Sequence, residues 1–365
     1  MMRRAQRTEL LYALLFIAPF LLYLLIFHGF AFVRAIYFSL TDKGLFNNPS
    51  FVGLSNYAYL FRDERFLLAL QHSIAYTLVV TVIQTFLALA LAAVLNQKLR
   101  GITFFRTVYY IPSILSSAAV TVIAIWFFQK TGFLNSLSAW FTAYAPVILA
   151  FVGIFILAQA VQVGWERSRG LPIAPTDPAL ATISLVVAIV LTWIFTATGL
   201  VAARPVQQPD FAWLSNTNTF LSIPIPLWAI MMLNIFTTIP TLMLIFLAGL
   251  QDIPRSVYEA ASIDGATPIQ QFFRVTVPML RPVTFLVVTL SLIGTLQMYD
   301  QVALMGNAAS LDSIIVLAYF VYNNVFNSNV PGNVGIASAA AIFLALLTFT
   351  IVGLQRFLGI SEKSY

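Results

Sequence analysis

Two long apolar stretches of the chain contain polar side chains that can bind a solute with many hydroxyl groups. These stretches cover residues 227–250 and 282–304. Asn234, Thr238 and Thr241 recur at near-helical spacing in the first stretch, so they can share one helix face. Amides and hydroxyls hydrogen-bond to the hydroxyl groups of a solute, and aromatic rings pack against its C–H groups. The candidate solute-pathway residues are Asn234, Thr237, Thr238, Thr241, Ser291, Thr295, Gln297, Tyr299 and Asp300.

The same side chains also have structural explanations, which the sequence leaves open. Threonine hydroxyls in membrane helices often hydrogen-bond to the preceding turn or to a neighbouring helix. An unpaired carboxylate inside hydrocarbon is costly, so Asp300 is the most informative single residue of the set. It stands about one turn from the end of its apolar stretch, which also fits an entrance residue or an ion-pair partner at the membrane surface.

The chain contains no motif for catalysis, ATP binding or metal binding. It has no Gly-rich loop ending in Gly-Lys-Ser/Thr, no His-Glu-x-x-His and no Gly-x-Ser-x-Gly. Without cysteine it has no disulfide, no thiolate metal ligand and no cysteine nucleophile. We therefore expect no catalytic residue, no metal site and no cofactor in this chain.

The elements that position these residues are expected to be membrane-spanning helices. Of the 365 residues, 60% are hydrophobic and 9% are charged, and the mean hydropathy is +0.90. A soluble domain is about a quarter charged, so the apolar excess indicates a lipid environment. The net charge of +6 does not indicate a nucleic-acid partner, because the basic residues lie between apolar stretches and form no stripe.

Eight uncharged stretches are long enough to cross a membrane, which takes about 20 mostly apolar residues per helix. They are Leu10 to Val33, Leu70 to Leu95, Val108 to Phe128, Tyr144 to Val163, Ala179 to Val201, Leu227 to Leu250, Pro282 to Leu304 and Ile336 to Phe357. The first is too long for a signal peptide and has no small-residue cleavage site, so we expect an uncleaved span. With the N-terminus inside, the inside loops contain about twice as many Lys and Arg residues as the outside loops. The sequence therefore predicts an all-α polytopic membrane protein with about eight transmembrane helices and both termini cytoplasmic.

These stretches divide the chain into four parts. Residues 1–69 are expected to form the first transmembrane helix and an outer loop, and residues 70–135 the second and third helices. Residues 136–208 are expected to form an inserted transmembrane hairpin. Residues 209–365 contain the last three helices and a cytoplasmic loop at 251–281.

This cytoplasmic loop has the pattern of two short helices rather than that of a passive linker. Asp252 fits a helix N-cap, residues 255–263 favour a helix, and Gly265 is placed to end it. A second short helix is expected to follow and to end at residues 275–278. Such a loop can dock to a partner or, alternatively, lie as an amphipathic segment on the membrane surface. The apolar side chains available for docking are Ile263, Phe272 and Phe273.

The loop resembles the cytoplasmic signature of permease subunits of binding-protein-dependent ABC importers, in the carbohydrate-uptake branch. That signature consists of Glu-Ala-Ala, then Asp-Gly-Ala, then an aromatic residue, a valine and two spaced prolines. In this chain it stands as Glu259, Ala260, Ala261, Asp264, Gly265, Ala266, Phe272, Val275, Pro278 and Pro282. Weaker similarities lie at residues 51–57 and 132–135, at Tyr322 and Phe326, and at residues 335–340. The resemblance thus covers most of the chain except residues 136 to about 208.

The resemblance implies an ABC type I importer permease fold with an extra helical hairpin, in a prokaryotic plasma (inner) membrane. The loop would be the coupling helix, seated in a separate ATP-binding subunit present as a homodimer. The residues implied in coupling are Glu259, Ala260, Ala261, Asp264, Gly265, Ala266, Phe272 and Pro278. Further partners would be a second, different permease and an extracytoplasmic solute-binding protein.

The implied function is uptake of a sugar, glycoside or polyol delivered by the binding protein and driven by the ATP-binding subunit. The pathway residues include no basic cluster, which disfavours a phosphorylated sugar. The alternative is a stand-alone secondary transporter, which would need several paired ionisable residues at mid-membrane, whereas only Asp300 approaches this condition.

The chain departs from the family pattern at residues 305–309, where many relatives carry a glycine-glycine-proline turn. This difference weakens any transfer of the relatives' binding-protein contacts to this loop.

Overall fold

The computed structural model describes residues 2–97, 101–170, 174, 176–326 and 333–357, most of which are helical. The chain divides into two compact units, Met1–Ala124 with Leu214–Tyr365, and Ile125–Trp213. The first unit starts with α1 (Met2–Tyr23), the π-helical segment η1 (Leu24–Gly29), α2 (Phe30–Ser39), α3 (Ser55–Leu60), α4 (Glu64–Leu95), α5 (Ile102–Ile114) and α6 (Ser117–Phe128), which runs into the second unit.

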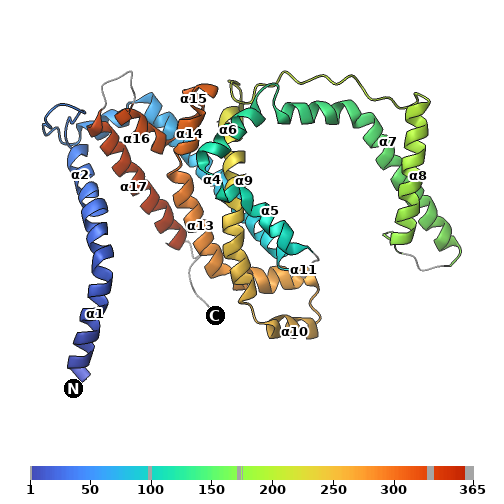
Figure 1. Cartoon of the computed structure of the whole chain (residues 1–365), viewed down its shortest axis with the longest axis horizontal. Coiled ribbons are helices and arrows are strands. Elements are labelled where there is room, and N and C mark those ends of the chain that lie inside the picture. Colours follow the sequence, from blue (N-terminus) through green and yellow to red (C-terminus); the bar gives the residue numbers. More distant parts are fainter. Residues whose placement is uncertain (1, 98–100, 171–173, 175, 327–332, 358–365) are drawn as a thin grey trace. The chain divides into compact units, whose positions relative to one another are not determined.

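The rest of the first unit follows the inserted unit (Figure 1). It begins with a small antiparallel hairpin of β1 (Thr219–Phe220) and β2 (Ile223–Pro224). The helices that follow are α9 (Ile225–Gln251), α10 (Arg255–Ile263), α11 (Pro268–Gln271), π-helical η2 (Phe272–Thr276), α12 (Val277–Met279), α13 (Arg281–Leu296), α14 (Asp300–Met305), 3-10 helix η3 (Gly306–Ala308), α15 (Leu311–Ile314), α16 (Leu317–Phe326) and α17 (Val334–Phe357).

Seven helical stretches among the described residues are long and apolar enough to cross a membrane. They are Leu11–Ser39, Glu64–Leu95, Ser117–Ser168, Pro178–Ala197, Ile225–Gln251, Arg281–Ala308 and Val334–Phe357. The expected number was about eight. The difference arises because the single stretch Ser117–Ser168 includes both α6 and α7, and so parts of the expected spans 108–128 and 144–163. The stretch 108–128 is itself not one helix. α5 ends at Ile114 and α6 begins at Ser117. Pro112, near the end of α5, lacks an N–H and crowds the preceding turn, which favours a break.

The first unit has two hydrophobic cores at opposite ends of α4. In one core the end of α4 from Ala88 onward packs against α9 and α13. Gly249 brings α9 close to α13, since a Cβ atom there would lie 2.7 Å from Val283 Cγ2. In the other core Phe66, at the start of α4, packs against α16 and α17. The aromatic rings around Phe66 are those of Phe61, Phe320 and Phe343.

Buried polar side chains join α4 to α13 between these cores. Thr81 Oγ1 and Thr295 Oγ1 lie 3.5 Å apart, and both residues are 5% exposed. Thr295 Oγ1 also donates to the Ser291 carbonyl oxygen at 2.8 Å. Thr77 and Gln84 of α4 are buried as well. This is the structural role for membrane-helix threonines that the sequence left open.

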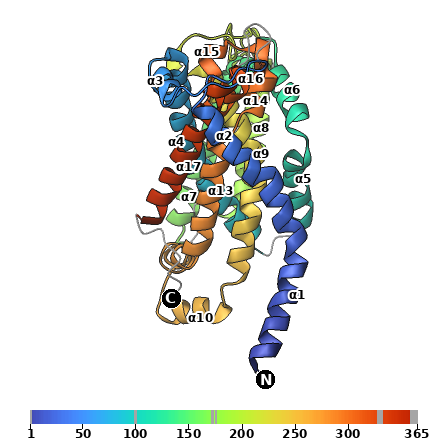
Figure 2. The ribbon, with the colours of Figure 1, turned by 90° about the vertical axis from the view of Figure 1, so that its left-hand side faces the viewer.

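The two ends of the first unit differ in what they present (Figures 1 and 2). The short helices α10 and α11 and the start of α1 lie at one end, and α14, α15 and α16 lie at the other. At the second end, Asn56 Nδ2 donates to the carbonyl oxygens of Ser39 and Thr41 at 2.9 and 2.8 Å. The Gly335 N–H donates to the Lys43 carbonyl oxygen at 2.7 Å. These bonds fix the loop after α2 to the start of α17.

The second unit is a helical hairpin with polar contacts of its own. Its helices are α7 (Phe133–Ser168) and α8 (Pro178–Ala197), after the last turn of α6. Within the hairpin, Ser184 Oγ donates to Gln159 Oε1 at 2.7 Å. At its open end, Asn135 Nδ2 donates to the Phe211 carbonyl oxygen at 2.7 Å, and Trp213 Nε1 donates to Asn135 Oδ1 at 3.0 Å. Asn135 therefore attaches the start of α7 to residues 211–213, which follow α8 in the chain.

Candidate functional site: a polar pocket and an exposed two-helix loop

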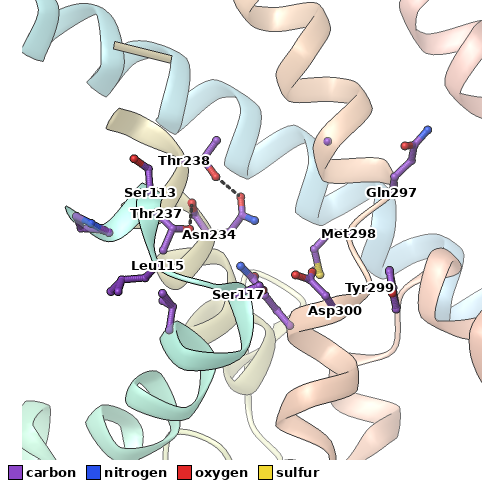
Figure 3. Close-up of a pocket in the computed structure, with 14 residues that line it drawn as sticks. Ser113, Leu115, Ser117, Asn234, Thr237, Thr238, Gln297, Met298, Tyr299 and Asp300 are labelled. Carbon is purple, nitrogen blue, oxygen red and sulfur yellow. Dashed lines mark hydrogen bonds between the residues drawn. The ribbon is translucent and has the colours of Figure 1, made fainter. Parts of the chain in front are cut away.

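A cavity of about 360 Å³ lies in the first unit, between the junction of α5 and α6, the middle of α9, and the junction of α13 and α14 (Figure 3). This volume is at the small end of the range for ligand pockets. The lining residues are Pro112, Ser113, Leu115, Ser117, Val120, Asn234, Thr237, Thr238, Gly294, Gln297, Met298, Tyr299, Asp300 and Gln301. Amides and hydroxyls dominate this set, so the cavity suits a solute that forms many hydrogen bonds.

Two of the three walls are breaks in helices. One wall lies where α5 ends at Ile114 and α6 begins at Ser117. Another lies where α13 ends at Leu296 and α14 begins at Asp300. Backbone groups that leave a helix at membrane depth must line a cavity or be buried in protein, because lipid cannot hydrogen-bond to them. Residues at both breaks line the same pocket, among them Ser113, Gln297 and Tyr299.

The third wall is a continuous part of α9. Thr238 Oγ1 donates to Asn234 Oδ1 at 3.4 Å, which orients the Asn234 amide (Figure 3). Thr237 Oγ1 lies 3.1 Å from the carbonyl oxygens of Leu233 and Asn234. Pro240, in the next turn, has no N–H and so leaves a carbonyl oxygen of α9 without its helical donor.

Two buried polar atoms of the lining have no hydrogen-bond partner among the described residues. They are Ser117 Oγ and Gln301 Oε1. A buried polar group left unpaired costs about 1–3 kcal/mol, so a solute that bonds to them gains by that amount. Asp300, in the first turn of α14, extends its side chain toward the side of the pocket formed by α6 (Figure 3).

The pocket brings together six of the predicted pathway residues. These are Asn234, Thr237, Thr238, Gln297, Tyr299 and Asp300. The ring of Tyr299 packs against that of Tyr322, with centroids 5.7 Å apart. Thr241, Ser291 and Thr295 do not line the pocket: Thr241 is exposed elsewhere on α9, and the other two are buried in α13.

The sequence analysis missed Ser113, Ser117 and Gln301, which line the pocket. Pro112 and Ser113 interrupt the stretch 108–128, and this interruption is the signal that could have indicated a helix break with a polar wall. Asp300 was placed inside a continuous span, whereas it starts a new helix after a three-residue break.

The predicted cytoplasmic loop forms two short helices joined by a defined turn. α10 ends at Ile263 with Asp264 as its C-cap, and the next residue, Gly265, has a φ of +79° in the left-handed region. The Ala266 N–H donates to the Ala261 carbonyl oxygen at 2.9 Å, and the Gly265 N–H donates to that of Ser262 at 3.1 Å. This pattern is the Schellman C-cap. Gly265 thus sets the direction in which the chain leaves α10.

Side-chain hydrogen bonds hold α10 against the following helices. Gln271 Nε2 donates to Ser262 Oγ at 2.9 Å and to the Ala266 carbonyl oxygen at 3.1 Å. The hydroxyls of Tyr258 and Thr276 lie 2.9 Å apart. Tyr258 also packs against the core formed by α4, α9 and α13. The loop is therefore a preorganised unit attached to the helices that carry the pocket.

The predicted coupling residues are divided between the surface and the interior of this loop. Glu259, Ala260, Asp264 and Gly265 are exposed, whereas Ala261, Ala266, Phe272 and Pro278 are half-buried. The exposed apolar side chains of the loop include Ile263, Ile269 and Phe273. Burying these three would favour docking onto an apolar surface.

Two local expectations for the loop were wrong. Asp252 is the C-cap of α9, and the N-cap of α10 is Pro254. The second helix does not end at residues 275–278, because η2 continues it into α12. Its start is fixed instead by a capping box in which Thr267 and Gln270 bond to each other's backbone N–H.

Polar side chains gathered around a cavity of a helical membrane protein are typical of a solute pathway, and a preorganised exposed loop is typical of a site for a partner. These features define the class of membrane transport subunits. The chain belongs to the family of binding-protein-dependent transport system inner membrane components, whose pattern matches residues 178–359. The resemblance found in the cytoplasmic loop is thereby confirmed.

Relatives with established names are similar over most of the chain. The multiple sugar-binding transport system permease protein MsmF of Streptococcus mutans is 28% identical over 94% of this chain and 92% of its own length. The lactose transport system permease protein LacF of Rhizobium radiobacter is 28% identical over 86% of this chain and 82% of its own length. A chain in the crystal structure of a bacterial alginate ABC transporter, in complex with an alginate pentasaccharide-bound periplasmic protein, shares the fold with a TM-score of 0.65. It is 18% identical, over 98% of this chain and 96% of that chain.

This chain is therefore a permease subunit of an ABC importer and a multi-pass protein of the inner membrane. It is a transport subunit and not an enzyme. An importer of this class works with an ATP-binding subunit and a solute-binding protein.

Proposed function

We propose that this permease moves a sugar, glycoside or polyol through the pocket between α6, α9 and α14. The observation that carries this proposal is that two helix breaks and the Asn234 face of α9 meet in one cavity lined by amides and hydroxyls. Such groups match the hydroxyls of a saccharide, and none of the described residues that line the cavity is Lys or Arg. The sugar-related names of the relatives support the same substrate class.

We further propose that the loop 251–281 couples the pocket to the ATP-binding subunit. Glu259 would form a charge-assisted contact with that subunit, while Ala260 allows a close approach and Ile263 enters an apolar recess. The ATP-binding subunit would be a homodimer that binds ATP and Mg²⁺. Because α9 ends and α13 begins at this loop, a displacement of α10 would move two walls of the pocket.

The proposed orientation places the loop and both termini in the cytoplasm. The start of α1 lies at the same end of the first unit as α10 (Figures 1 and 2), which agrees with the charge distribution of the loops. A second, different permease would complete the solute path. Within the span Leu11–Ser39, the most apolar 18-residue window has no buried residue in this chain, although Ser39 at its end is buried. The apolar surface of that window is left for lipid or for the second permease.

Affinity purification of the tagged chain from its native membrane in mild detergent tests this assembly. We expect an ATP-binding subunit and a second permease to copurify, and the reconstituted complex to take up a saccharide only with ATP and the binding protein. Uptake in liposomes by the chain alone, without ATP, would show that it is a secondary transporter and would refute the proposal.

A further inference from the structure

The pocket contains a single charged side chain. Of the 14 lining residues drawn in Figure 3, only Asp300 is charged. Among the described residues no Lys, Arg or His lies within ion-pair distance of its carboxylate, since the ion pairs there are Arg65 with Asp312 and Lys130 with Asp210. The pocket therefore presents an uncompensated acidic group beside the neutral hydrogen-bonding groups of Asn234 and Ser117.

An unpaired carboxylate at this position has consequences for the charge of the solute. In a cavity walled by protein and lipid, two charges interact several times more strongly than in water. A carboxylate also accepts hydrogen bonds only, so it suits adjacent hydroxyls or an ammonium group and cannot donate to an anionic oxygen. A uronate or phosphate placed beside Asp300 would meet repulsion with no cation in the lining to offset it.

We propose that Asp300 is a charge-selecting residue, which makes this importer carry neutral or amine-bearing saccharides and reject uronates and phosphorylated sugars. The proposal rests on the proposed function of the pocket and adds the charge class of its substrate. Asn234 and Gln301, whose Oε1 is buried and unpaired, would bind the uncharged hydroxyls of the same solute. The helix break before α14 positions Asp300, since it lets a polar residue start a new helix beside the cavity.

The test uses the complete importer, with its binding protein, in proteoliposomes. The probes are three sets of disaccharides that differ at one sugar unit: a neutral set, an amine-bearing set and a uronate set. Competition among them is measured for the native chain and for Asp300→Asn. Because the binding protein is the same in both, its own preference cancels when the two selectivity ratios are compared.

The native importer should favour the neutral and amine-bearing sets over the uronates by about 100-fold, as expected for one uncompensated like-charge contact. Asp300→Asn should reduce this preference by about tenfold or more, while uptake of the neutral set falls by less than tenfold. The control is Asp312→Asn, which removes the same charge from an exposed residue outside the pocket and should leave the ratio unchanged.

Three results would overturn the proposal. The first is equal uptake of neutral and uronate sugars by the native importer, and the second is an unchanged ratio in Asp300→Asn. The third is loss of the second permease from purified Asp300→Asn, which would show that Asp300 pairs with a cation of that subunit. Failure of every saccharide to be taken up would instead refute the proposed function itself, and the charge selection with it.

Discussion

The loop 251–281 and the pocket differ in how the sequence encodes them. The loop is one continuous segment whose conformation follows from local rules: a Schellman cap at Gly265, a capping box at Thr267 and hydrogen bonds from Gln271. The pocket combines three segments of the chain, residues 112–120, 234–238 and 294–301, and at two of them a helix is interrupted. A partner-binding loop can therefore be recognised from its motif, whereas a solute site requires the packing of distant helices.

The two regions are linked by the same pair of helices. α9 runs from the pocket to the loop, and α13 returns from the loop to the pocket. They pack closely at Gly249, and under the proposed coupling a movement of the loop would reach the pocket through this pair of helices. Substitutions in the loop should thus act on coupling, substitutions at Gly249 on both regions, and substitutions in the pocket on the solute alone.

The largest effect is expected from charge reversal on the exposed face of α10. Glu259→Arg should lower ATP-driven uptake by about 100-fold or more, as for the loss of a central charged contact at an interface. Insertion into the membrane should be unchanged, because Glu259 is exposed and forms no ion pair within the described chain. The measurement is uptake together with ATPase activity of the reconstituted importer. Asp252→Arg, an exposed control outside α10, should retain uptake, and normal uptake by Glu259→Arg would remove the proposed coupling role.

A smaller effect is expected where the two regions are linked. Gly249→Val adds side-chain atoms where a Cβ atom alone would lie 2.7 Å from Val283 Cγ2. Overpacking of this kind costs about 1–3 kcal/mol, so the thermal transition of the purified complex should fall and uptake should fall with it. Val283→Ala in the same chain makes room and should restore part of both. Equal stability of Gly249→Val and the native protein would mean that α9 and α13 are free to separate.

The turn at Gly265 should tolerate few substitutions, although there is open space around it. A Cβ atom at Gly265 would meet no atom within 4 Å, yet Gly265→Val forces a β-branched residue to a φ of +79°. This strain costs about 1–2 kcal/mol, and we expect uptake to fall about tenfold through a misplaced α10. Asn accepts left-handed backbone, so Gly265→Asn should retain most of the activity. Equal loss in both variants would point to a lack of space at the partner rather than to backbone strain.

The parts of the fold that the sequence predicted follow from local and periodic signals. Apolar length identified the spans, and the cap residues of the loop identified its two helices, although Asp252 was assigned to the wrong helix. The break between α5 and α6 was not predicted, because a proline near a helix end is compatible with either a kink or a stop.

The candidate pocket was predicted only in part, because burial depends on which face of each helix meets its neighbours. Asn234 and Thr238 share a face that opens to the cavity, whereas Thr295 faces Thr81 and is used for helix packing. In the sequence, Thr238 and Thr295 cannot be told apart, because each is a threonine within a long apolar stretch. Gln301 was not a candidate, since its role depends on the break that starts α14.

The smallest effect is expected from uncharged substitutions in α9. Comparing two of them distinguishes the face of α9 that lines the pocket from its other faces. Asn234→Leu removes the amide that Thr238 orients, and the loss of one neutral hydrogen bond to the solute is worth about 1 kcal/mol. The KM for uptake should therefore rise about five- to tenfold, with ATPase coupling unchanged. Thr241→Val, on the same helix but outside the pocket, should leave KM as it is. A larger effect at Thr241 than at Asn234 would mean that the solute follows another face of α9, and the assignment of the pocket as the solute site would then be wrong.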